Sequence, residues 1–251
     1  MQKAYKLLAI QEKISNNEAK ALIDMGLVSV SGKRLELARV EIKENSVFKV
    51  QKPAKPIKIY EDENIIAINK PAFLISEQIA KDFKFELLNR LDKETSGVLL
   101  MCKNDEFKQK VIKEFKENRV KKTYFAAIKG IFADEMEINL PISTLKTKSG
   151  AFSKIDQIHG KTAISRVYPF LVSNKKSLVK VEIDTGRTHQ IRVHLANAGF
   201  AVIGDEKYGK NKASRIYLHS YETKLLDYCF KAPLDKSFGE LGFELPREIT
   251  K

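Results

Sequence analysis

Cysteine is scarce in this sequence. Only Cys102 and Cys229 occur among its 251 residues, they stand far apart, and there is no C-x-x-C pair. Neither a zinc site nor a disulfide framework is therefore indicated, because both need several cysteines at short, regular spacing. His189 and His194 have no set of Cys, Asp or Glu ligands beside them at metal spacing, so we expect no metal ion. This use of cysteine fits a reducing cytoplasm.

Long apolar runs are also missing. Nowhere do about 18 consecutive apolar residues occur, which is the length needed to span a bilayer. The first residues, MQKAYKLLAIQEK, contain no apolar signal core. We therefore expect a soluble, cytoplasmic protein that is not exported and does not act at a membrane.

Basic residues outnumber acidic ones. The 45 Lys and Arg residues against 32 Asp and Glu residues give a formal net charge of +13 and a pI near 9.5. Such a charge favours polyanionic partners, and nucleic acid first of all, because lysine and arginine release the counterions condensed on phosphates. A solvated, lysine-rich surface would give the same charge. The charge therefore needs support from motifs.

The length and local patterns predict two domains. At 251 residues, with 43% hydrophobic and 31% charged residues, the chain has a globular composition. The segment from Ser15 to Glu18 has the form of a capping box, Gly26 stands where the helix would end, and LVSVSGKRLEL and SVFKV follow as short strands, the first two around a Ser31-Gly32 turn. We predict a small α/β domain over residues 1–52, a proline-containing linker over 53–56, and a larger domain over 57–251.

Strand patterns dominate the larger predicted domain. IKIY and IIAIN flank an acidic turn as in a hairpin, and further strands are predicted in TYFAAIKG, TAISRVYPFLV, SLVKVEID and RIYLHSYETKL. A basic amphipathic helix is predicted from Asp105 to Asn118. Because helices are few and do not alternate regularly with strands, we expect an α+β fold with a mixed, largely antiparallel sheet.

Two polar clusters stand next to predicted core elements. Asp92 follows Arg90 by two residues, so both side chains project to one face of an extended segment or converge in a turn. The second cluster, Thr185 to His194, opens a predicted helix on which His189 and Arg192 would share a face. Such an arginine could reach a buried carboxylate and favour its ionised form. Taken alone, the first cluster also fits an ion-paired surface turn, and the histidines fit ordinary core or surface positions.

The order of the motifs resembles that of the RluA-type pseudouridine synthases. That family carries a K-P segment, RLD-x-x-TSG before an apolar run, a K-x-Y-x-A strand, and GRTHQIR-x-H followed by GD-x-x-YG. This sequence shows them as Lys70-Pro71, Arg90 to Met101, Lys122 to Ala126, and Gly186 to Gly209. The resemblance extends from about Ile57 to Leu225, and RLDKETSG and RTHQIRVHL are its highly specific parts. ISNNEAKALIDMGLVSVSGKRL similarly resembles the small alpha-L RNA-binding module that precedes many of these enzymes.

The resemblance implies an enzyme that isomerises uridine in RNA to pseudouridine without a cofactor. Asp92 would be the essential carboxylate, either as nucleophile or as base at the sugar. Arg192 would pair with Asp92, and Tyr124 would stack on the uracil and help remove the proton from carbon 5. Arg90 would fill the gap left when the target nucleotide is flipped out. Further substrate or RNA contacts are expected at Leu218, Arg187, His189, Gln190 and Lys70.

Alternatives stay open at this point. A non-catalytic RNA-binding or ribosome-assembly factor could keep the fold, although it would not need these catalytic residues. A metal-dependent nuclease would explain the charge, but no carboxylate cluster is present in the sequence to hold magnesium. We expect large-subunit rRNA, or else tRNA, as substrate and a monomer as the oligomeric state. Asn89 replaces the usual histidine, and Ala72-Phe73 replace a glycine-containing loop, so we expect a different substrate entrance.

Overall fold

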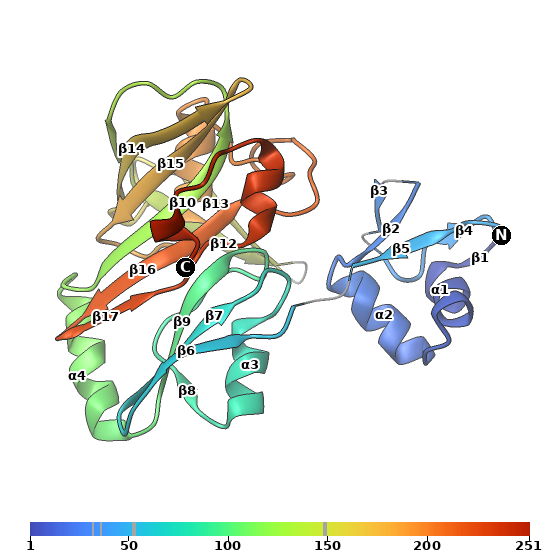
Figure 1. Ribbon diagram of the computed structural model, residues 1–251, viewed down its shortest axis with the longest axis horizontal. Coiled ribbons are helices and arrows are strands. Elements are labelled where there is room, and N and C mark those ends of the chain that lie inside the picture. Colours follow the sequence, from blue (N-terminus) through green and yellow to red (C-terminus); the bar gives the residue numbers. More distant parts are fainter. Residues whose placement is uncertain (32, 36, 52–53, 148–149) are drawn as a thin grey trace. The chain divides into compact units, whose positions relative to one another are not determined.

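The computed structural model describes residues 1–31, 33–35, 37–51, 54–147 and 150–251. They form two compact units, Met1–Lys55 and Pro56–Lys251 (Figure 1). Each unit has its own hydrophobic core. The linker predicted over 53–56 includes Pro53, which lies outside the described residues. That linker stays a prediction, as does the division into an RNA-binding and a catalytic domain.

The first unit combines two helices with short strands. Its α2 has the predicted capping box: Ser15 Oγ accepts from the backbone N–H of Glu18 at 3.1 Å, and Glu18 Oε2 accepts from that of Ser15 at 2.8 Å. The two strands predicted around the Ser31-Gly32 turn pair in antiparallel fashion, while Gly32 lies outside the described residues. In chain order the elements are β1 (Gln2–Lys3), α1 (Ala4–Glu12), α2 (Asn16–Asp24), β2 (Val28–Val30), β3 (Lys33–Arg34), β4 (Glu41–Ile42) and β5 (Phe48–Val50).

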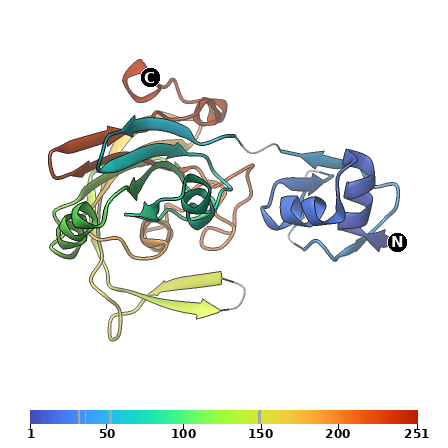
Figure 2. The same cartoon turned by 90° about the horizontal axis from the view of Figure 1, so that it is seen from below.

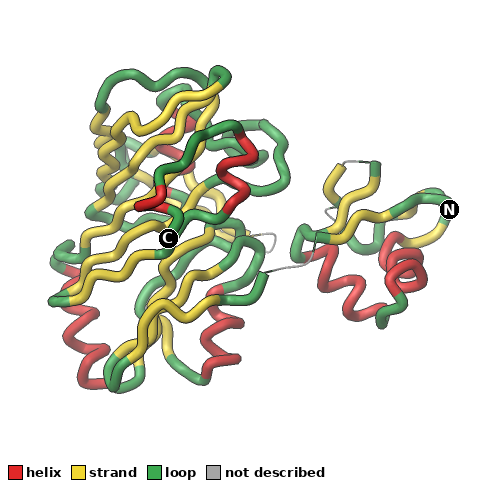
Figure 3. The backbone as a smooth tube through the Cα atoms, viewed as in Figure 1, coloured by secondary structure: helices red, strands yellow, loops and turns green. Residues whose placement is uncertain are grey.

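The second unit consists mainly of strands (Figure 3). The predicted basic helix is present, and Asn104 caps it by accepting a hydrogen bond from the backbone N–H of Phe107 at 2.8 Å. The elements are β6 (Ile57–Glu61), β7 (Ile65–Lys70), α3 (Ser76–Phe83), β8 (Glu86–Leu87), β9 (Ser96–Cys102), α4 (Asp105–Lys116), β10 (Lys121–Lys129), β11 (Met136–Asn139), β12 (Ile142–Thr147), β13 (Gly150–Ile155), β14 (Ile164–Ser173), β15 (Lys176–Ile183), α5 (Gln190–Asn197), β16 (Leu218–Leu225), β17 (Tyr228–Lys231), and the 3-10 helices η1 (Lys236–Leu241) and η2 (Arg247–Ile249).

A ten-stranded sheet forms the centre of this unit, and it confirms the predicted α+β class. The strand order is β11-β14-β15-β10-β16-β9-β7-β6, with β17 beside β16 and β8 beside β9. Within the described residues, β16 and β9 pair in parallel and the other neighbours are antiparallel. The sheet is therefore mixed and largely antiparallel.

Helices cover both faces of the sheet. Successive strand residues point to opposite sides, so each face offers apolar side chains against which helices pack. On one face, Ile66, Leu99 and Ala126 share a core with Ile79 of α3 and residues of α5. On the other face, the alternate strand residues pack against Phe107 and Val111 of α4 or against Phe238 of η1. The first of these cores borders the polar clusters.

Gly97 allows the parallel contact that brings β9 next to β16. Ser96 and Gly97 pair with His219 and Ser220. The φ angle of Gly97 is +113°, and a Cβ atom there would lie 2.1 Å from the carbonyl oxygen of Ser220. A side chain therefore cannot be accommodated without moving a strand. The residues just before Gly97 include Asp92, so this contact places the first polar cluster beside the start of β16.

Two parts of the second unit differ from the sequence prediction or were not predicted. The strand expected over RIYLHSYETKL begins only at Leu218, because Arg215 turns into a buried network of polar groups. The β12–β13 hairpin was not predicted; its strands pair with each other, and Figure 2 shows it as an arm projecting from the sheet. No helix in the described part of the chain is long and apolar enough to cross a membrane.

Candidate active site

The loop that carries Asp92 is attached to β9 by the side chain of Asn89. Asn89 Oδ1 accepts a hydrogen bond from the backbone N–H of Leu100 at 2.7 Å, and its Nδ2 donates to the carbonyl oxygen of Val98 at 3.3 Å. The amide thus acts as a short strand partner for β9, offering one acceptor and one donor. These two bonds give Asn89 a structural role at the position where the resemblance led us to expect histidine.

Ser76 and Lys70 fix the same loop from its other side. Ser76 Oγ accepts from the backbone N–H of Leu91 at 3.2 Å and donates to its carbonyl oxygen at 3.0 Å. Lys70 is fully buried, and its ammonium donates to the carbonyl oxygens of Pro71, Leu74 and Lys93 at 3.0, 2.8 and 3.2 Å. These three bonds use all three hydrogens of a charged ammonium.

Burial, and after it the charge of Arg215, lower the pKa of Lys70 to about 7, while the carboxylates of Asp92 and Glu94 act in the opposite direction. A contact between Lys70 and RNA, as the sequence predicts, would require this loop to open. In the structure Lys70 instead joins the backbone of the segment from Pro71 to Leu74 to that of Lys93, the residue after Asp92.

Asp92 faces two cationic or potentially cationic side chains of the second cluster. Its side chain is 27% exposed, so it is reachable from solvent. Arg192 Nη1 lies 3.5 Å from Asp92 Oδ2, and His189 Nε2 lies 3.7 Å from the same oxygen. The structure thus brings together three residues predicted from the sequence. Both contacts are longer than an ordinary hydrogen bond between charged groups.

The main partner of Arg192 is Asp205 rather than Asp92. Arg192 Nε and Nη2 donate to Asp205 Oδ2 and Oδ1 at 2.8 and 2.9 Å, a bidentate pair in which both side chains are almost completely buried. Burial by itself lowers the pKa of Arg192, but the bonds to Asp205 and the nearby charges of Asp92 and Glu94 outweigh burial and raise it. The expected pairing of Arg192 with Asp92 is therefore present only as a longer contact, and the carboxylate of Glu94 lies farther still, at 3.9 Å from Arg192 Nη1.

His189 lies just before α5 and not within it. Its φ angle of 55° is in the left-handed region, so the predicted helix begins one residue later, at Gln190. From this position His189 Nδ1 lies 2.7 Å from Tyr208 Oη, while Nε2 faces Asp92. Burial lowers the pKa of His189; the Asp92 charge acts against this change, and Arg192 and Lys207 add to it.

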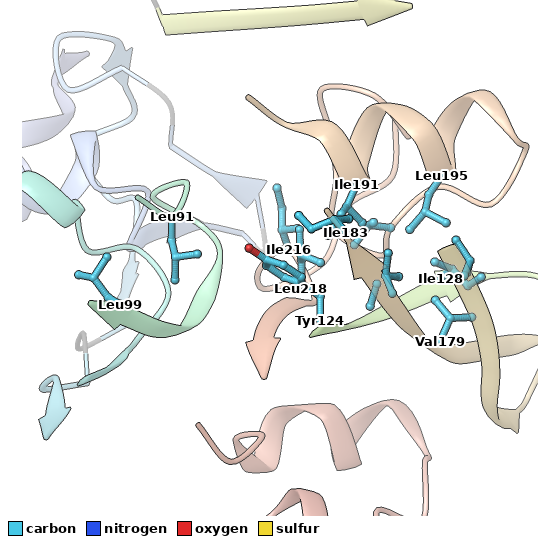
Figure 4. Close-up of a cluster of buried hydrophobic side chains, with 14 of the residues drawn as sticks. Leu91, Leu99, Tyr124, Ile128, Val179, Ile183, Ile191, Leu195, Ile216 and Leu218 are labelled. Carbon is cyan, nitrogen blue, oxygen red and sulfur yellow. The ribbon is translucent and has the colours of Figure 1, made fainter. Parts of the chain in front are cut away.

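Tyr124 and Leu218 belong to the apolar core that borders the two polar clusters. Both are buried in the core on the α3 and α5 face, and Figure 4 shows them close together, next to Ile183. Burial raises the pKa of the Tyr124 phenol to about 12, and the Asp92 charge contributes to the rise, while Ser220 acts against it. Tyr124 is therefore a neutral phenol at ordinary pH, within electrostatic reach of Asp92.

The other predicted contact residues lie in different surroundings. The Arg90 side chain is 69% exposed and its Nη1 lies 3.3 Å from Glu77 Oε1 of α3. Arg187 is half-buried and its Nε donates to the carbonyl oxygen of Thr162 at 3.0 Å. Gln190 is buried, and protein groups bond both ends of its amide, so a contact with RNA would have to replace one of these bonds.

Two residues of the site were not among the sequence predictions, namely Asp205 and Tyr208. Besides its bond to His189, Tyr208 has its ring beneath the Arg192 guanidinium, 5.2 Å from ring centroid to Cζ. Both residues belong to the GD-x-x-YG motif, so their position in the sequence was a signal. Their partners could not be assigned from it, since a motif does not say which distant side chain it meets.

In the described residues, no three His, Cys, Asp or Glu side chains gather as metal ligands would.

Several known proteins with similar sequences are described as pseudouridine synthases. A family model described as RNA pseudouridylate synthase matches residues 47–197. A Helicobacter pylori (strain J99 / ATCC 700824) protein named as an uncharacterized RNA pseudouridine synthase is 51% identical, over 95% of this chain and 99% of its own. The ribosomal large subunit pseudouridine synthase C of Rickettsia bellii (strain RML369-C) is 38% identical, over 64% of this chain and 61% of its own.

Solved structures share the fold. Human RNA pseudouridylate synthase domain containing 1 superposes with a TM-score of 0.63 at 24% identity, covering 74% of this chain and 86% of that one. Human RNA pseudouridylate synthase domain containing 4 gives a TM-score of 0.64 at 21% identity, with 76% and 94% covered. At these identities the likeness concerns the fold alone.

Proposed function

Because this chain belongs to the RNA pseudouridylate synthase family, within its RluA type, we propose that it isomerises uridine in large-subunit ribosomal RNA through Asp92. The enzyme class, pseudouridine synthase, follows from the family. The choice of RNA is supported by relatives named as ribosomal large subunit pseudouridine synthases, from Rickettsia bellii and from Borreliella burgdorferi. Transfer RNA is the alternative substrate. The proposal places the reaction in the cytoplasm and the enzyme as a monomer.

The position of Asp92 carries the proposal. It is a carboxylate that solvent can reach, it faces Arg192 and His189, and its charge acts on the buried phenol of Tyr124. A carboxylate between a cation and an apolar wall can stay ionised and still meet a substrate that enters from solvent. This combination is what a reaction at a sugar next to a flat, uncharged base requires.

The reaction exchanges one bond of uracil for another. The bond between C1′ of the ribose and N1 of the base breaks, the base turns, and a bond forms between C1′ and C5. The hydrogen on C5 leaves as a proton and N1 takes up a proton, so the atoms balance without a redox change. Asp92 can serve as nucleophile or as base at the sugar, and the proposal keeps both roles open.

Tyr124 and Leu218 are proposed to hold the uracil. An aromatic ring offers a stacking surface, and Leu218 belongs to the same apolar core. Since the pKa of Tyr124 is about 12, its hydroxyl keeps its proton at neutral pH. Tyr124 therefore acts first as a stacking surface, and it can accept the C5 proton only through a lone pair of the neutral phenol or after losing its own proton.

Arg90 is proposed to occupy the space of the flipped nucleotide. Arg90 forms a surface ion pair with Glu77, and both side chains are more than half exposed. Such pairs contribute little, so Arg90 can leave Glu77 for RNA at small cost. The target base must leave its stack because the reacting atoms are inaccessible within a helix.

The test replaces Asp92 by Asn, which keeps the size of the side chain and removes its charge. We expect RNA binding to stay within about two-fold and conversion to fall by at least about 10²-fold. Tritium released from RNA that carries uridine labelled at carbon 5 measures conversion, and filter binding measures affinity. Substrates should include large-subunit rRNA and tRNA transcripts.

Asp134→Asn is the matched control, because Asp134 is an exposed carboxylate on a surface turn. It should convert RNA at the wild-type rate. Tritium release by Asp92→Asn at the wild-type rate would remove Asp92 from the mechanism. Conversion of the tRNA transcript but not of rRNA would leave the reaction in place and overturn the proposed substrate.

A further inference from the structure

The β12–β13 hairpin is bonded to the active site at Ser153. Ser153 pairs with Thr144 across the hairpin, and its side chain is buried. Its backbone N–H donates to Tyr208 Oη at 2.9 Å, and its hydroxyl donates to the carbonyl oxygen of Thr188 at 2.8 Å. The hairpin, which projects from the sheet in Figure 2, is thus joined directly to the two residues that flank the site at positions 188 and 208.

The bond from Ser153 leaves the hydrogen of the Tyr208 hydroxyl for another acceptor. A backbone N–H can only donate, so Tyr208 Oη accepts from Ser153. His189 Nδ1 lies 2.7 Å from Tyr208 Oη, and the hydroxyl hydrogen can be donated to it. Because His189 Nε2 faces a carboxylate oxygen of Asp92, which only accepts, the tautomer with the hydrogen on Nε2 fits both neighbours, and Nδ1 then accepts from Tyr208.

An imidazole that accepts at Nδ1 carries its hydrogen on Nε2. His189 Nε2 faces Asp92 Oδ2 at 3.7 Å, which a small shift of either side chain would shorten to a hydrogen bond. The chain of donors therefore runs from the backbone of Ser153 through Tyr208 and His189 to Asp92. In this arrangement Tyr208 and His189 each accept from one neighbour and donate to the next.

We propose that Tyr208 is a positioning residue for the reaction: held by the backbone of β13, its hydroxyl fixes His189 as a neutral Nε2 donor toward Asp92. This inference rests on the proposed role of Asp92. The donor steadies the carboxylate in the orientation that meets the sugar. Because a neutral imidazole does not neutralise Asp92, the carboxylate keeps its charge for the reaction.

The charges around His189 agree with a neutral ring. The groups facing it are Asp92 and Asp205, which favour its protonation, and Arg192 and Lys207, which oppose protonation, together with the hydroxyl of Tyr208. Burial is the largest influence, and it lowers the pKa of His189. Replacing the tyrosine hydroxyl by hydrogen would remove the hydrogen bond that the neutral ring accepts at Nδ1. The neutral form of His189 would lose this stabilisation, so its pKa would rise.

The first experiment compares Tyr208→Phe with Tyr221→Phe in single-turnover tritium release. Phenylalanine at 208 keeps the ring next to Phe152 and Arg192 and removes only the hydroxyl. We expect RNA affinity within about two-fold of wild type and a rate about 10-fold lower, as for the loss of one hydrogen bond that orients a reacting group. The acid limb of the rate profile should move to higher pH.

Tyr221→Phe is the control, because its hydroxyl bonds to the carbonyl oxygen of Glu248 and its ring packs in the core on the other face of the sheet. It should leave the rate and the pH profile unchanged. If Tyr208→Phe also matches wild type in both, the inference is overturned. It is overturned as well if the variant loses RNA affinity and rate in equal proportion with an unshifted profile.

The second experiment repeats Tyr208→Phe in a His189→Gln background. The amide nitrogen of glutamine can take the place of Nε2 as a donor, and it needs no tyrosine to define which atom carries the hydrogen. We expect Tyr208→Phe to lower the rate no further in this background. An equal loss in both backgrounds would show that Tyr208 acts independently of His189. Tritium release by Asp92→Asn at the wild-type rate, by contrast, would remove Asp92 from the mechanism and with it the premise of this inference, whatever the result for Tyr208→Phe.

Discussion

Arg192 contacts the carboxylates of Asp205, Asp92 and Glu94 unequally. The bidentate pair with Asp205 is short and almost fully buried, whereas the contact with the partly exposed Asp92 is longer. Asp205 therefore fixes the position of the Arg192 guanidinium. The positive charge of the guanidinium still acts on Asp92, although the two groups are not tightly bonded. A carboxylate that must react is better placed in the second position, because a close bidentate bond would occupy its oxygens.

Replacing Asp205 by Asn should affect both stability and rate. The amide keeps one acceptor but loses the charge that compensates the buried Arg192, and breaking a buried pair in this way costs on the order of 3 kcal/mol in the free energy of unfolding. The freed guanidinium should also bind Asp92 more closely and slow conversion. Urea denaturation and single-turnover tritium release measure the two effects.

The matched control for Asp205→Asn is Asp227→Asn, at an exposed turn between β16 and β17. It should change the free energy of unfolding by less than about 0.5 kcal/mol. An Asp205→Asn protein as stable and as active as wild type would show that Arg192 needs no buried partner.

Single residues also show how far their sequence context can assign roles. Lys70 and Gln190 stand in motifs that we expected to contact RNA. In the structure their polar atoms are instead hydrogen-bonded to backbone groups and buried side chains. Asn89 likewise binds the backbone of β9. A polar residue in a reactive motif can hold a loop in place by hydrogen bonds instead of binding the substrate. The sequence motif is the same for both roles, so it does not distinguish them.

Among the elements, β9, β16 and the segment after β17 are joined by a buried polar network. Arg215 Nη2 donates to Ser96 Oγ, Ser96 Oγ lies 2.8 Å from His219 Nδ1, and His219 Nε2 donates to the carbonyl oxygen of Ala232 at 2.8 Å. Burial lowers the pKa of His219 to about 4, with the Ala232 carbonyl acting against and Arg215 adding to this change. The network is adapted to a neutral imidazole.

Acid should therefore destabilise this junction. In the unfolded chain His219 takes up a proton near its ordinary pKa of 6.5, whereas in the folded protein it does so only near 4. The unfolded state thus binds more protons between these values, and the stability present above pH 6.5 is lost as pH falls toward 4, by roughly 3 kcal/mol. Urea denaturation between pH 7 and pH 4 measures the slope.

His219→Gln should be less stable at pH 7 and should show a shallower slope between pH 6.5 and 4. His159→Gln, at an exposed position, is the control and should retain the wild-type slope. If the slopes of His219→Gln and wild type coincide, protonation of His219 does not contribute to acid unfolding.

For the whole molecule, the first unit has a core of its own, formed by α1, α2 and the strands β2 and β5. Its residues carry more Lys and Arg than Asp and Glu. Together with the resemblance to the alpha-L module, this supports the proposal that residues 1–55 add phosphate contacts to those made near Asp92. Their effect should then depend on salt.

Deleting residues 1–55 should weaken RNA binding and make its salt dependence shallower. Each phosphate contact that is lost reduces the slope of log K against log salt by about one. Filter binding over a salt series measures the slope, and circular dichroism checks that Pro56–Lys251 stays folded. An unchanged slope in a folded protein would show that the first unit makes no phosphate contacts.

The sequence by itself determined the family, the class of reaction and the α+β class. Residue types in a fixed order, such as RLDKETSG before RTHQIRVHL, are local properties of the chain, and so are a capping box or an alternating strand. The ends of strands were predicted less accurately where tertiary contacts decide them, as at Arg215, which lies before the observed start of β16.

Only the tertiary structure decided which side chains meet. Arg192 forms its shorter contacts with Asp205 and a longer one with Asp92. Tyr208 is hydrogen-bonded to both His189 and the β12–β13 hairpin. These pairings depend on sheet register and on the close approach allowed by Gly97. Contacts between residues far apart in sequence arise from packing of the whole sheet, and no local pattern contains them.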